Sequence, residues 1–432
     1  INNIVVCDGA VLTLNSSATV SRDLIINTGA SLTINPGKSL TVTETLLNSG
    51  TLDIKASASG VGSLIHNTDN VSANVECYFE EDQWHGVSAP ISDGLSGVFT
   101  GTYLKYYTES DSSWSYITEI DYSLTPGQGY FAWNYDNQTV TYSGTLNNGD
   151  INPTLSYTSA AAHEGQGWNF IGNPFPSYVD YDGTWTSSNI DGTIYLYNGS
   201  NYVTWNGSTG GHGSGDIPPG QAFWVHANAA SPSITIPQNK RKHSTQAFYK
   251  DEQTNVFKLE VTGNEYKDQI SIAFNNETTH AFDPQFDAYK LFGIYDAPQL
   301  YMKNNEINYS VNYIPVEENI SIPLFLEVAV EGAYILTNLS ESFATYSDAI
   351  LEDLLTDELI DLNEVDSYQF NAGPSQADTR FVLHFYGING ININESDGIT
   401  LYSYGSSIYV NSDILEFGNL VVYDILGRTV FS

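Results

Sequence analysis

The feature that most constrains the fold of this chain is a 20-residue repeat within its first 67 residues. The apolar positions that recur at this interval are Leu12, Leu32 and Leu52 and, two residues later, Leu14, Ile34 and Ile54. A unit this short cannot bury its apolar face alone, so successive units stack as the coils of a β-solenoid. We therefore expect residues 1–75 to form a short β-solenoid, with Thr13, Thr33 and Asp53 in register on its outer face.

This outer column has two interpretations. It is either a flat ligand surface, as in ice-binding or glycan-active solenoids, or the plain exterior of a structural cap or of one end of a longer solenoid. Three short coils offer a small platform, which favours the structural role.

The rest of the chain also predicts strands. Its 30 Tyr and 19 Phe favour half-buried strands, and its Gly, Asn, Asp and Ser favour turns. No window keeps a 3.6-residue apolar period over three turns, and residues 349–362 come closest. The predicted fold class is therefore all-β.

Residues 76–240 contain a tandem duplication. The segment 84–91, which begins Trp-His-Gly-Val, aligns with 168–175, and the Pro-Gly-Gln segment at 125–131 aligns with 218–224. Pro-Gly favours a type II turn between two aromatic strands. We expect the two copies to pack as one β-sandwich-like module with pseudo-twofold symmetry.

Two further regions follow the duplication. Residues 238–250 are a basic, polar break that holds Lys240 and Lys242. We expect it to be a linker that pairs with acidic neighbours, and a basic partner site is the alternative. Residues 241–388 show strands separated by Asn, Asp and Gly turns, which predicts a second β-sandwich. Residues 389–432 form a separate terminal segment.

Charge and composition exclude several partners. The formal net charge of −36 repels nucleic acid and anionic lipid. No run of 18 apolar residues is present, so we expect no membrane span. The two cysteines, Cys7 and Cys77, are several predicted coils apart, so we expect no disulfide between them.

Two groups of residues are candidate binding sites. Acidic Asp-Gly turns at Asp180, Asp182 and Asp191 offer hard oxygens to Ca²⁺, the one cofactor the sequence suggests, although Asx-turns that close hairpins explain the same pattern. The aromatic residues of the second copy could stack on sugar rings, or they could form the core of the module. These candidate glycan-binding residues are Trp185, Tyr195, Tyr197, Tyr202 and Trp205. The sequence holds no Gly-x-Ser-x-Gly, His-Glu-x-x-His or phosphate-loop motif, so we expect no enzyme activity.

The last residues run from a strand at 420–423 through Asp-Ile-Leu-Gly-Arg into a second strand. This phrase resembles the Ig-like C-terminal sorting domain of proteins exported by the type IX secretion system of Bacteroidota. The resemblance implies that Asp424, Leu426, Gly427 and Arg428 belong to the sorting signal, and that the secretion machinery is a partner. It also implies an extracellular or outer-surface location, and a start at Ile1 without methionine is expected of a chain whose export signal has been removed.

The resemblance extends to phrases at 167–177 and 286–291, which are similar to non-catalytic β-modules of large exported Bacteroidota proteins. It also has a departure, because the family domain continues beyond this phrase with several more strands. The chain stops at Ser432. We therefore expect a partial sorting domain, either truncated or completed by another molecule.

Together these features predict a secreted or cell-surface structural or adhesive protein. It would bind surfaces, cells or glycans, or self-associate within a surface layer or filament. The alternative is the non-catalytic C-terminal region of a larger exported polysaccharide-degrading enzyme.

Overall fold

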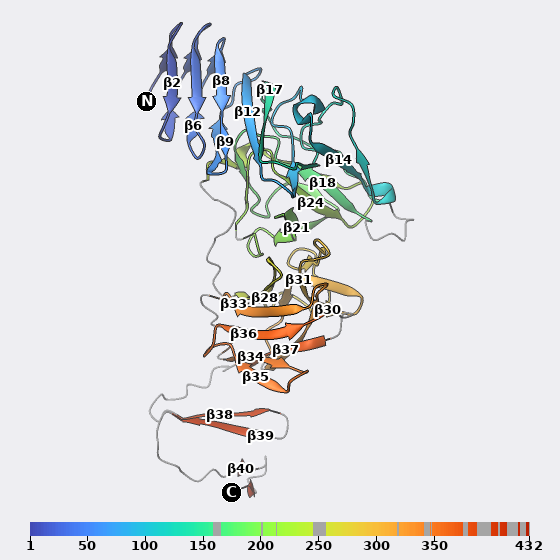
Figure 1. Ribbon diagram of the computed structural model, residues 1–432. Coiled ribbons are helices and arrows are strands. Elements are labelled where there is room, and N and C mark those ends of the chain that lie inside the picture. Colours follow the sequence, from blue (N-terminus) through green and yellow to red (C-terminus); the bar gives the residue numbers. More distant parts are fainter. Residues whose placement is uncertain are drawn as a thin grey trace. The chain divides into compact units, whose positions relative to one another are not determined.

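The structure is a computed structural model of residues 1–432, and its chain trace is shown in Figure 1. It describes all residues except 159–165, 200–201, 213, 245–255, 318, 341–345, 347, 375–378, 387–398, 405–406, 413–421, 424–428 and 432, and for 399–431 it describes the backbone alone. The fold is almost entirely β, as predicted. Residues 1–387 and 388–432 form two compact units.

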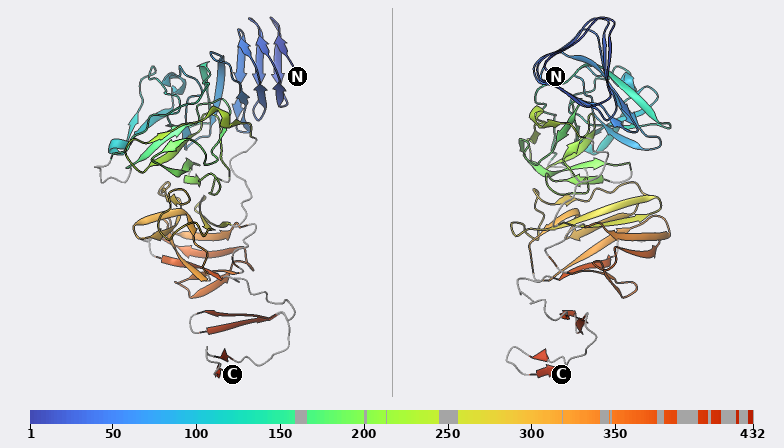
Figure 2. Two further views of the ribbon diagram at one scale, coloured as in Figure 1. Left: turned by 180° about the vertical axis from the view of Figure 1, so that it is seen from behind. Right: turned by 90° about the vertical axis from the view of Figure 1, so that its left-hand side faces the viewer.

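The N-terminal strands form stacked coils with three sheets, seen nearly end-on in the right-hand view of Figure 2. Their strands are β1 (Ile4–Val6), β2 (Val11–Leu14), β3 (Ala18–Val20), β4 (Leu24–Ile26), β5 (Ser31–Ile34), β6 (Ser39–Val42), β7 (Leu46–Asn48), β8 (Thr51–Ile54), β9 (Ala56–Ser57), β10 (Gly60–Val61) and β11 (Ser63–Ile65). Leu12 lies beside Leu32, and Leu32 beside Leu52, in parallel register. The repeat therefore predicted the register correctly. Cys7 and Cys77 are free.

The solenoid continues directly into the duplicated module. Strand β12 (Ser72–Phe79) pairs in parallel with β8 on one side and antiparallel with β17 (Gln138–Thr145) on the other. This five-stranded sheet covers the last coil, so Leu52 and Ile54 are buried in the same core as Val75 and Tyr142.

Each copy of the duplication contributes one four-stranded sheet with the same strand order. The first sheet, in sheet order, contains β13 (Trp84–Val87), β16 (Tyr130–Trp133), β14 (Tyr103–Thr108) and β15 (Ser113–Tyr116). The second contains β18 (Trp168–Gly172), β24 (Ala222–Ala227), β21 (Ile190–Tyr197) and β22 (Tyr202–Trp205). Short elements complete the module, namely β19 (Tyr178–Asp180), β20 (Ser187–Ser188), β23 (Asp216–Ile217), β25 (Ser233–Ile234), β26 (Arg241–Lys242) and the 3₁₀ helices Ser96–Phe99, Glu109–Asp111 and Gln238–Lys240.

Reciprocal hydrogen bonds show the pseudo-twofold symmetry of the module. Ser88 N donates to Gly220 O at 2.7 Å, and the matching Gly172 N donates to Gly127 O at 3.0 Å. Both glycines have positive φ, at +66° and +80°, in their Pro-Gly turns. Each turn therefore packs against the Trp-bearing strand of the other copy, and the left-handed conformation at its centre explains why glycine stands there.

The third region is one continuous sheet of eleven strands that surrounds a single core. Its strands are β27 (Val256–Gly263), β28 (Tyr266–Phe274), β29 (Ala288–Tyr289), β30 (Gln299–Asn304), β31 (Ile307–Ile314), β32 (Asn319–Glu327), β33 (Gly332–Asn338), β34 (Asp348–Asp353), β35 (Glu358–Asp361), β36 (Ser367–Ala372) and β37 (Thr379–Tyr386). Where a second β-sandwich was expected, the strands hydrogen-bond into one sheet, in which β29 pairs with β31 beside the main path of strands. Residues 349–362, the closest approach to a helical pattern, belong largely to the hairpin of β34 and β35.

In the C-terminal unit, the described residues form two antiparallel pairs of strands. Strand β38 (Ile399–Tyr404) pairs with β39 (Ser407–Ser412), and β40 (Val422–Tyr423) pairs with β41 (Thr429–Phe431). The second pair flanks the predicted sorting phrase on both sides. Asp424, Leu426, Gly427 and Arg428 themselves lie outside the described residues.

No helix among the described residues is long and apolar enough to cross a membrane.

Candidate functional site

The five aromatic residues suggested as glycan-binding are mostly core residues. Trp185, Tyr195, Tyr197 and Trp205 are buried, and Tyr202 is half-buried. Alternating strand geometry explains this, because the inward faces of β21 and β22 pack on the module core and their outward faces pack beneath the third region.

Their polar atoms are used internally. Trp185 Nε1 donates to Asp180 O at 2.7 Å, and Trp205 Nε1 donates to Tyr181 O at 2.9 Å. The hydroxyl of Tyr195 accepts a hydrogen bond from Tyr289 N at 2.9 Å, and burial raises the pKa of this tyrosine well above its ordinary value. These side chains hold the second copy together and leave little surface for a sugar.

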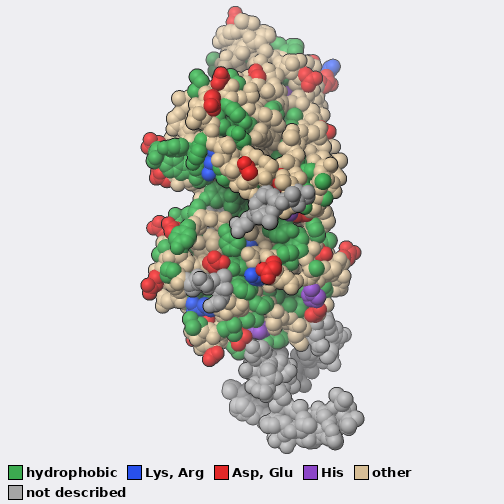
Figure 3. All heavy atoms as spheres, turned by 90° about the vertical axis from the view of Figure 1, so that its right-hand side faces the viewer, with side chains coloured by type: hydrophobic (Ala, Val, Ile, Leu, Met, Phe, Trp, Pro, Cys, Tyr) green, Lys and Arg blue, Asp and Glu red, His purple; other side chains and the backbone are tan. Residues whose placement is uncertain are grey.

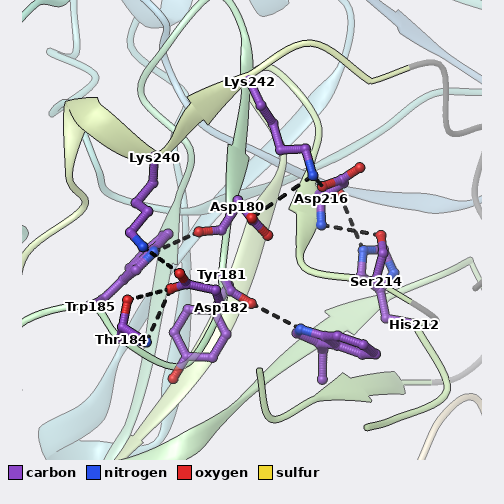
Figure 4. Close-up of polar contacts among 11 residues, drawn as sticks. Asp180, Tyr181, Asp182, Thr184, Trp185, His212, Ser214, Asp216, Lys240 and Lys242 are labelled. Carbon is purple, nitrogen blue, oxygen red and sulfur yellow. Dashed lines mark hydrogen bonds and ion pairs between the residues drawn. The ribbon is translucent and has the colours of Figure 1, made fainter. Parts of the chain in front are cut away.

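Lysine ammonium groups lie against two of the acidic residues suggested for calcium, Asp180 and Asp182. Figure 4 shows Lys240 bound to Asp182, while Lys242 lies 2.6 Å from Asp216 and 3.9 Å from Asp180. Thr184 also donates to Asp182 through its backbone N at 3.1 Å and its Oγ1 at 2.7 Å. The lysines therefore take the place beside these carboxylates that a metal cation would need.

The pKa values of these carboxyls follow from their partners. Burial raises the pKa of Asp180, and Lys242 only partly offsets this. Burial also acts to raise the pKa of Asp182, but hydrogen bonds from Lys240 and Thr184 outweigh it and lower that pKa.

Asp191 binds a different set of partners. Its Oδ2 lies 2.6 Å from His226 Nδ1, and its Oδ1 accepts a hydrogen bond from Asn228 Nδ2 at 2.7 Å. Over the parts of the chain that the structure describes, no group of three or more His, Cys, Asp or Glu side chains is arranged to hold a metal ion.

The basic segment that follows the duplication joins the module to the solenoid. Arg241 donates to His66 O and to Asn67 Oδ1, both at 2.8 Å. The ring of His243 lies within hydrogen-bonding distance of Thr41 Oγ1, at 2.8 Å, and Ser63 Oγ, at 2.7 Å. The segment thus binds acidic and polar neighbours on both sides.

A different group of aromatic side chains is exposed. Tyr103, Tyr116 and Tyr135 are 50%, 58% and 65% exposed, and they surround the partly buried Trp133. The ring centroid of Trp133 lies 4.4 Å from that of Tyr135 and 5.6 Å from that of Tyr103, which is 6.4 Å from that of Tyr116. We call these four residues the aromatic platform.

Strand register builds the platform. Tyr103 on β14 lies directly opposite Trp133 on β16, and Tyr116 lies on the neighbouring strand β15. Residues opposite each other across two strands share one face of the sheet, so the rings are side by side. A hydrogen bond with Tyr103 raises the pKa of Tyr135.

Polar groups border the platform. Asp136 and Asn137, which are both exposed, follow Tyr135 in the chain, and Asn137 Oδ1 accepts a hydrogen bond from Tyr78 OH at 3.1 Å. Aromatic faces with hydrogen-bonding groups at their rim can bind the C–H faces and hydroxyls of a sugar. On the face drawn in Figure 3, hydrophobic side chains likewise gather in patches between acidic ones.

Sequence reasoning missed the platform because both copies are rich in aromatic residues. Tyr103 and Trp133 are 30 residues apart, and only the pairing of β14 with β16 brings them together. The signal that could have found them is the alternation of residues 103, 105 and 107 with the buried Leu104, which places three large side chains on one face.

Comparison with known proteins identifies the family of the chain but assigns no activity to it. No curated protein and no solved structure matches the chain. One family model, described as a domain of unknown function (DUF8693), matches residues 2–205 and 195–385. These two matches cover most of the chain, which therefore belongs to the DUF8693 family.

Proposed function

We propose that this chain is a non-catalytic surface protein that binds polysaccharide through the aromatic platform. The resemblance of its terminal phrase to type IX sorting domains supports export to the cell surface or the medium. In this role the solenoid, the module and the third region hold the platform on a rigid β-scaffold.

The observation that carries the proposal is the clustering of three exposed tyrosine rings around the partly buried ring of Trp133. Each exposed ring leaves apolar surface in water, at a cost of about 25 cal/mol per Å². Single exposed aromatic residues are common, but a contiguous group with a polar rim is typical of a binding surface.

The second copy of the duplication strengthens this argument. Its corresponding sheet face is covered by the third region, since the rings of Trp168 and His226 lie 6.2 Å and 5.1 Å from that of Tyr289. In the second copy, the third region of the chain therefore covers the aromatic face of the sheet. The platform on the first copy has no such cover among the described residues.

Charge narrows the ligand class. The net charge of −36 opposes nucleic acid, whose binding depends on phosphate neutralisation by basic side chains. Polysaccharides can instead bind through ring stacking and neutral hydrogen bonds, which fits the residues of the platform and its rim.

The test is a glycan array followed by calorimetry on the best ligand. Tyr135→Ala and Trp133→Ala should each weaken binding by at least about tenfold, because stacked aromatic residues dominate such interfaces. Tyr295→Ala is the matched control, since Tyr295 is 83% exposed on the third region. A wild-type chain that binds no glycan, or equal losses in all three variants, would overturn the proposal.

A further inference from the structure

The pseudo-twofold symmetry of the module singles out Lys105. In the first copy Lys105 lies opposite Phe131, and in the second copy Tyr195 lies opposite Trp224. Phe131 and Trp224 are matching residues of the two Pro-Gly-Gln segments. A lysine thus occupies in the first copy the place that a buried tyrosine occupies in the second.

Aromatic rings surround the ammonium group of Lys105. Its Nζ lies 3.7 Å from the ring centroid of Trp84, 4.6 Å from that of Trp114 and 5.7 Å from that of Phe131. Such cation–π contacts attract the charge to the ring faces but do not neutralise it.

No carboxylate within the described part of the chain forms an ion pair with Lys105. This is notable in a protein with 50 acidic and 14 basic residues, where Lys55, Lys240, Lys242, Lys267 and Lys290 all have carboxylate partners. Burial lowers the pKa of Lys105 from its ordinary value. The residue is half-buried, so part of it stays in contact with solvent.

Lys105 adjoins the platform on the same face of the sheet. It lies directly opposite Tyr116 on β15 and two residues after Tyr103 on β14. Side chains two apart on a strand share a face, so Lys105 lies on the face of the sheet that carries the platform, next to Tyr103 and Tyr116.

We propose that Lys105 makes the platform selective for polysaccharides that carry anionic groups, as carboxylates of uronic acids or as sulfate esters. This inference rests on the proposed function. A sugar stacked on Trp133 and Tyr103 would bring an anionic substituent close to the ammonium group of Lys105. The rings of Trp84 and Trp114 hold that charge in place, so little side-chain entropy is lost when it pairs with the ligand.

The overall negative charge sets the conditions for this selectivity. At low salt the −36 charge repels an acidic polymer over long distances. At an ionic strength of about 0.15 M the Debye length is about 8 Å, so distant carboxylates are screened while the contact at Lys105 persists. Preference for acidic ligands should therefore be greater at moderate salt than at low salt.

The experiment compares matched neutral, uronate-bearing and sulfated polysaccharides by calorimetry on the full chain. Lys105→Met keeps the aliphatic stem and removes the charge, and Lys105→Arg keeps the charge. Lys105→Met should lose about tenfold in affinity for the acidic ligands, as expected for a charge-assisted hydrogen bond, and keep its affinity for the neutral one. Lys105→Arg should retain the preference for acidic over neutral ligands. Comparison of the uronate-bearing with the sulfated polysaccharide shows which anionic group is preferred.

A pH series separates a charge effect from a structural one. The wild-type preference for acidic ligands should disappear on raising the pH, and at a lower pH than an ordinary lysine would give. If Lys105→Met keeps the preference, or loses neutral and acidic ligands equally, the selectivity inference is wrong while the platform stands. If the wild type binds none of the three ligands, the proposed function itself fails.

Discussion

At the residue scale, the same amino acid has opposite roles depending on whether another part of the chain covers the strand face that carries it. Tyr195 is completely buried and accepts a backbone hydrogen bond, whereas Tyr103, on the related strand of the first copy, is half-exposed. Nothing in the two side chains differs. Their environments differ because another part of the chain covers one sheet face and leaves part of the other open.

The buried ion pair of Asp353 and Arg380 gives a prediction about stability at this scale. Asp353 is fully buried and accepts hydrogen bonds from Arg380, from Nε to Oδ1 at 3.0 Å and to Oδ2 at 3.2 Å and from Nη2 to Oδ2 at 2.7 Å. Burial acts to raise the pKa of Asp353, but the hydrogen bonds from Arg380 and Leu355 outweigh it and lower that pKa. Arg380→Met would leave this carboxylate unpaired, at a cost of about 3–5 kcal/mol near neutral pH.

The pH dependence follows from the sign of this shift. A carboxyl with a lowered pKa in the folded state stabilises the protein above its unfolded pKa of about 3.9, and the stabilisation is lost as pH falls through the folded value. The deficit of Arg380→Met should therefore shrink below about pH 4. Hydrogen exchange at β34 and β37 measures it locally. Arg22→Met is the control, because the exposed pair of Arg22 and Glu44 should contribute less than about 1 kcal/mol. Equal deficits at all pH values, or in both variants, would contradict the prediction.

At the element scale, the basic segment around β26 joins the duplicated module to the solenoid. It pairs antiparallel with β19 of the second copy, and Arg241 and His243 reach the solenoid. The sequence predicted a linker paired with acidic neighbours, and the ion pairs of Lys240 and Lys242 agree with that expectation. Which acids they meet depends on the fold, because Asp182, in the loop after β19, and Lys240, in the 3₁₀ helix Gln238–Lys240, are far apart in the sequence.

This pairing predicts how calcium binding should respond to mutation. The double variant Lys240→Met and Lys242→Met would free Asp180, Asp182 and Asp216 of their ammonium partners. Calorimetry on chelator-treated protein should then show stronger Ca²⁺ binding than the wild type, since carboxylate oxygens are the ligands that calcium prefers. Lys303→Met, a lysine on β30, is the control. The prediction fails if the wild type binds Ca²⁺ as strongly as the double variant and loses this binding in Asp182→Asn. That result would show that the lysines do not compete with calcium.

At the scale of the whole molecule, the segment 286–290 connects the module to the third region. Asn206 Nδ2 donates to Phe286 O at 2.8 Å, Thr193 Oγ1 donates to Asp287 O at 3.1 Å, and Tyr289 N donates to Tyr195. Burial raises the pKa of Asp287 to about 7, although its carboxylate accepts the backbone N–H groups of Asp283 and Tyr313. These contacts make the two regions one compact unit.

The prediction for the whole molecule concerns its location. Expressed behind a signal peptide in a bacterium with a type IX system, the chain should reach the surface or the medium. The double variant Gly427→Ala and Arg428→Ala should be retained inside the cell envelope, because it alters the phrase that resembles a sorting signal. Immunoblots of cell fractions measure this, with Trp133→Ala as an export-competent control. Equal export of all three chains would count against the type IX assignment.

The sequence alone determined the solenoid register, the duplication and the Pro-Gly turns, because each depends on residues that are near neighbours or that recur at a constant interval. Leu12, Leu32 and Leu52 align without knowledge of any other part of the chain. Only the tertiary structure decided which aromatic faces are covered. Tyr289 covers the second copy from nearly a hundred residues away, whereas the first copy keeps Tyr103 and Tyr135 in solvent. Strand alternation places side chains on a face, but burial depends on what packs against that face, and no local pattern encodes that contact.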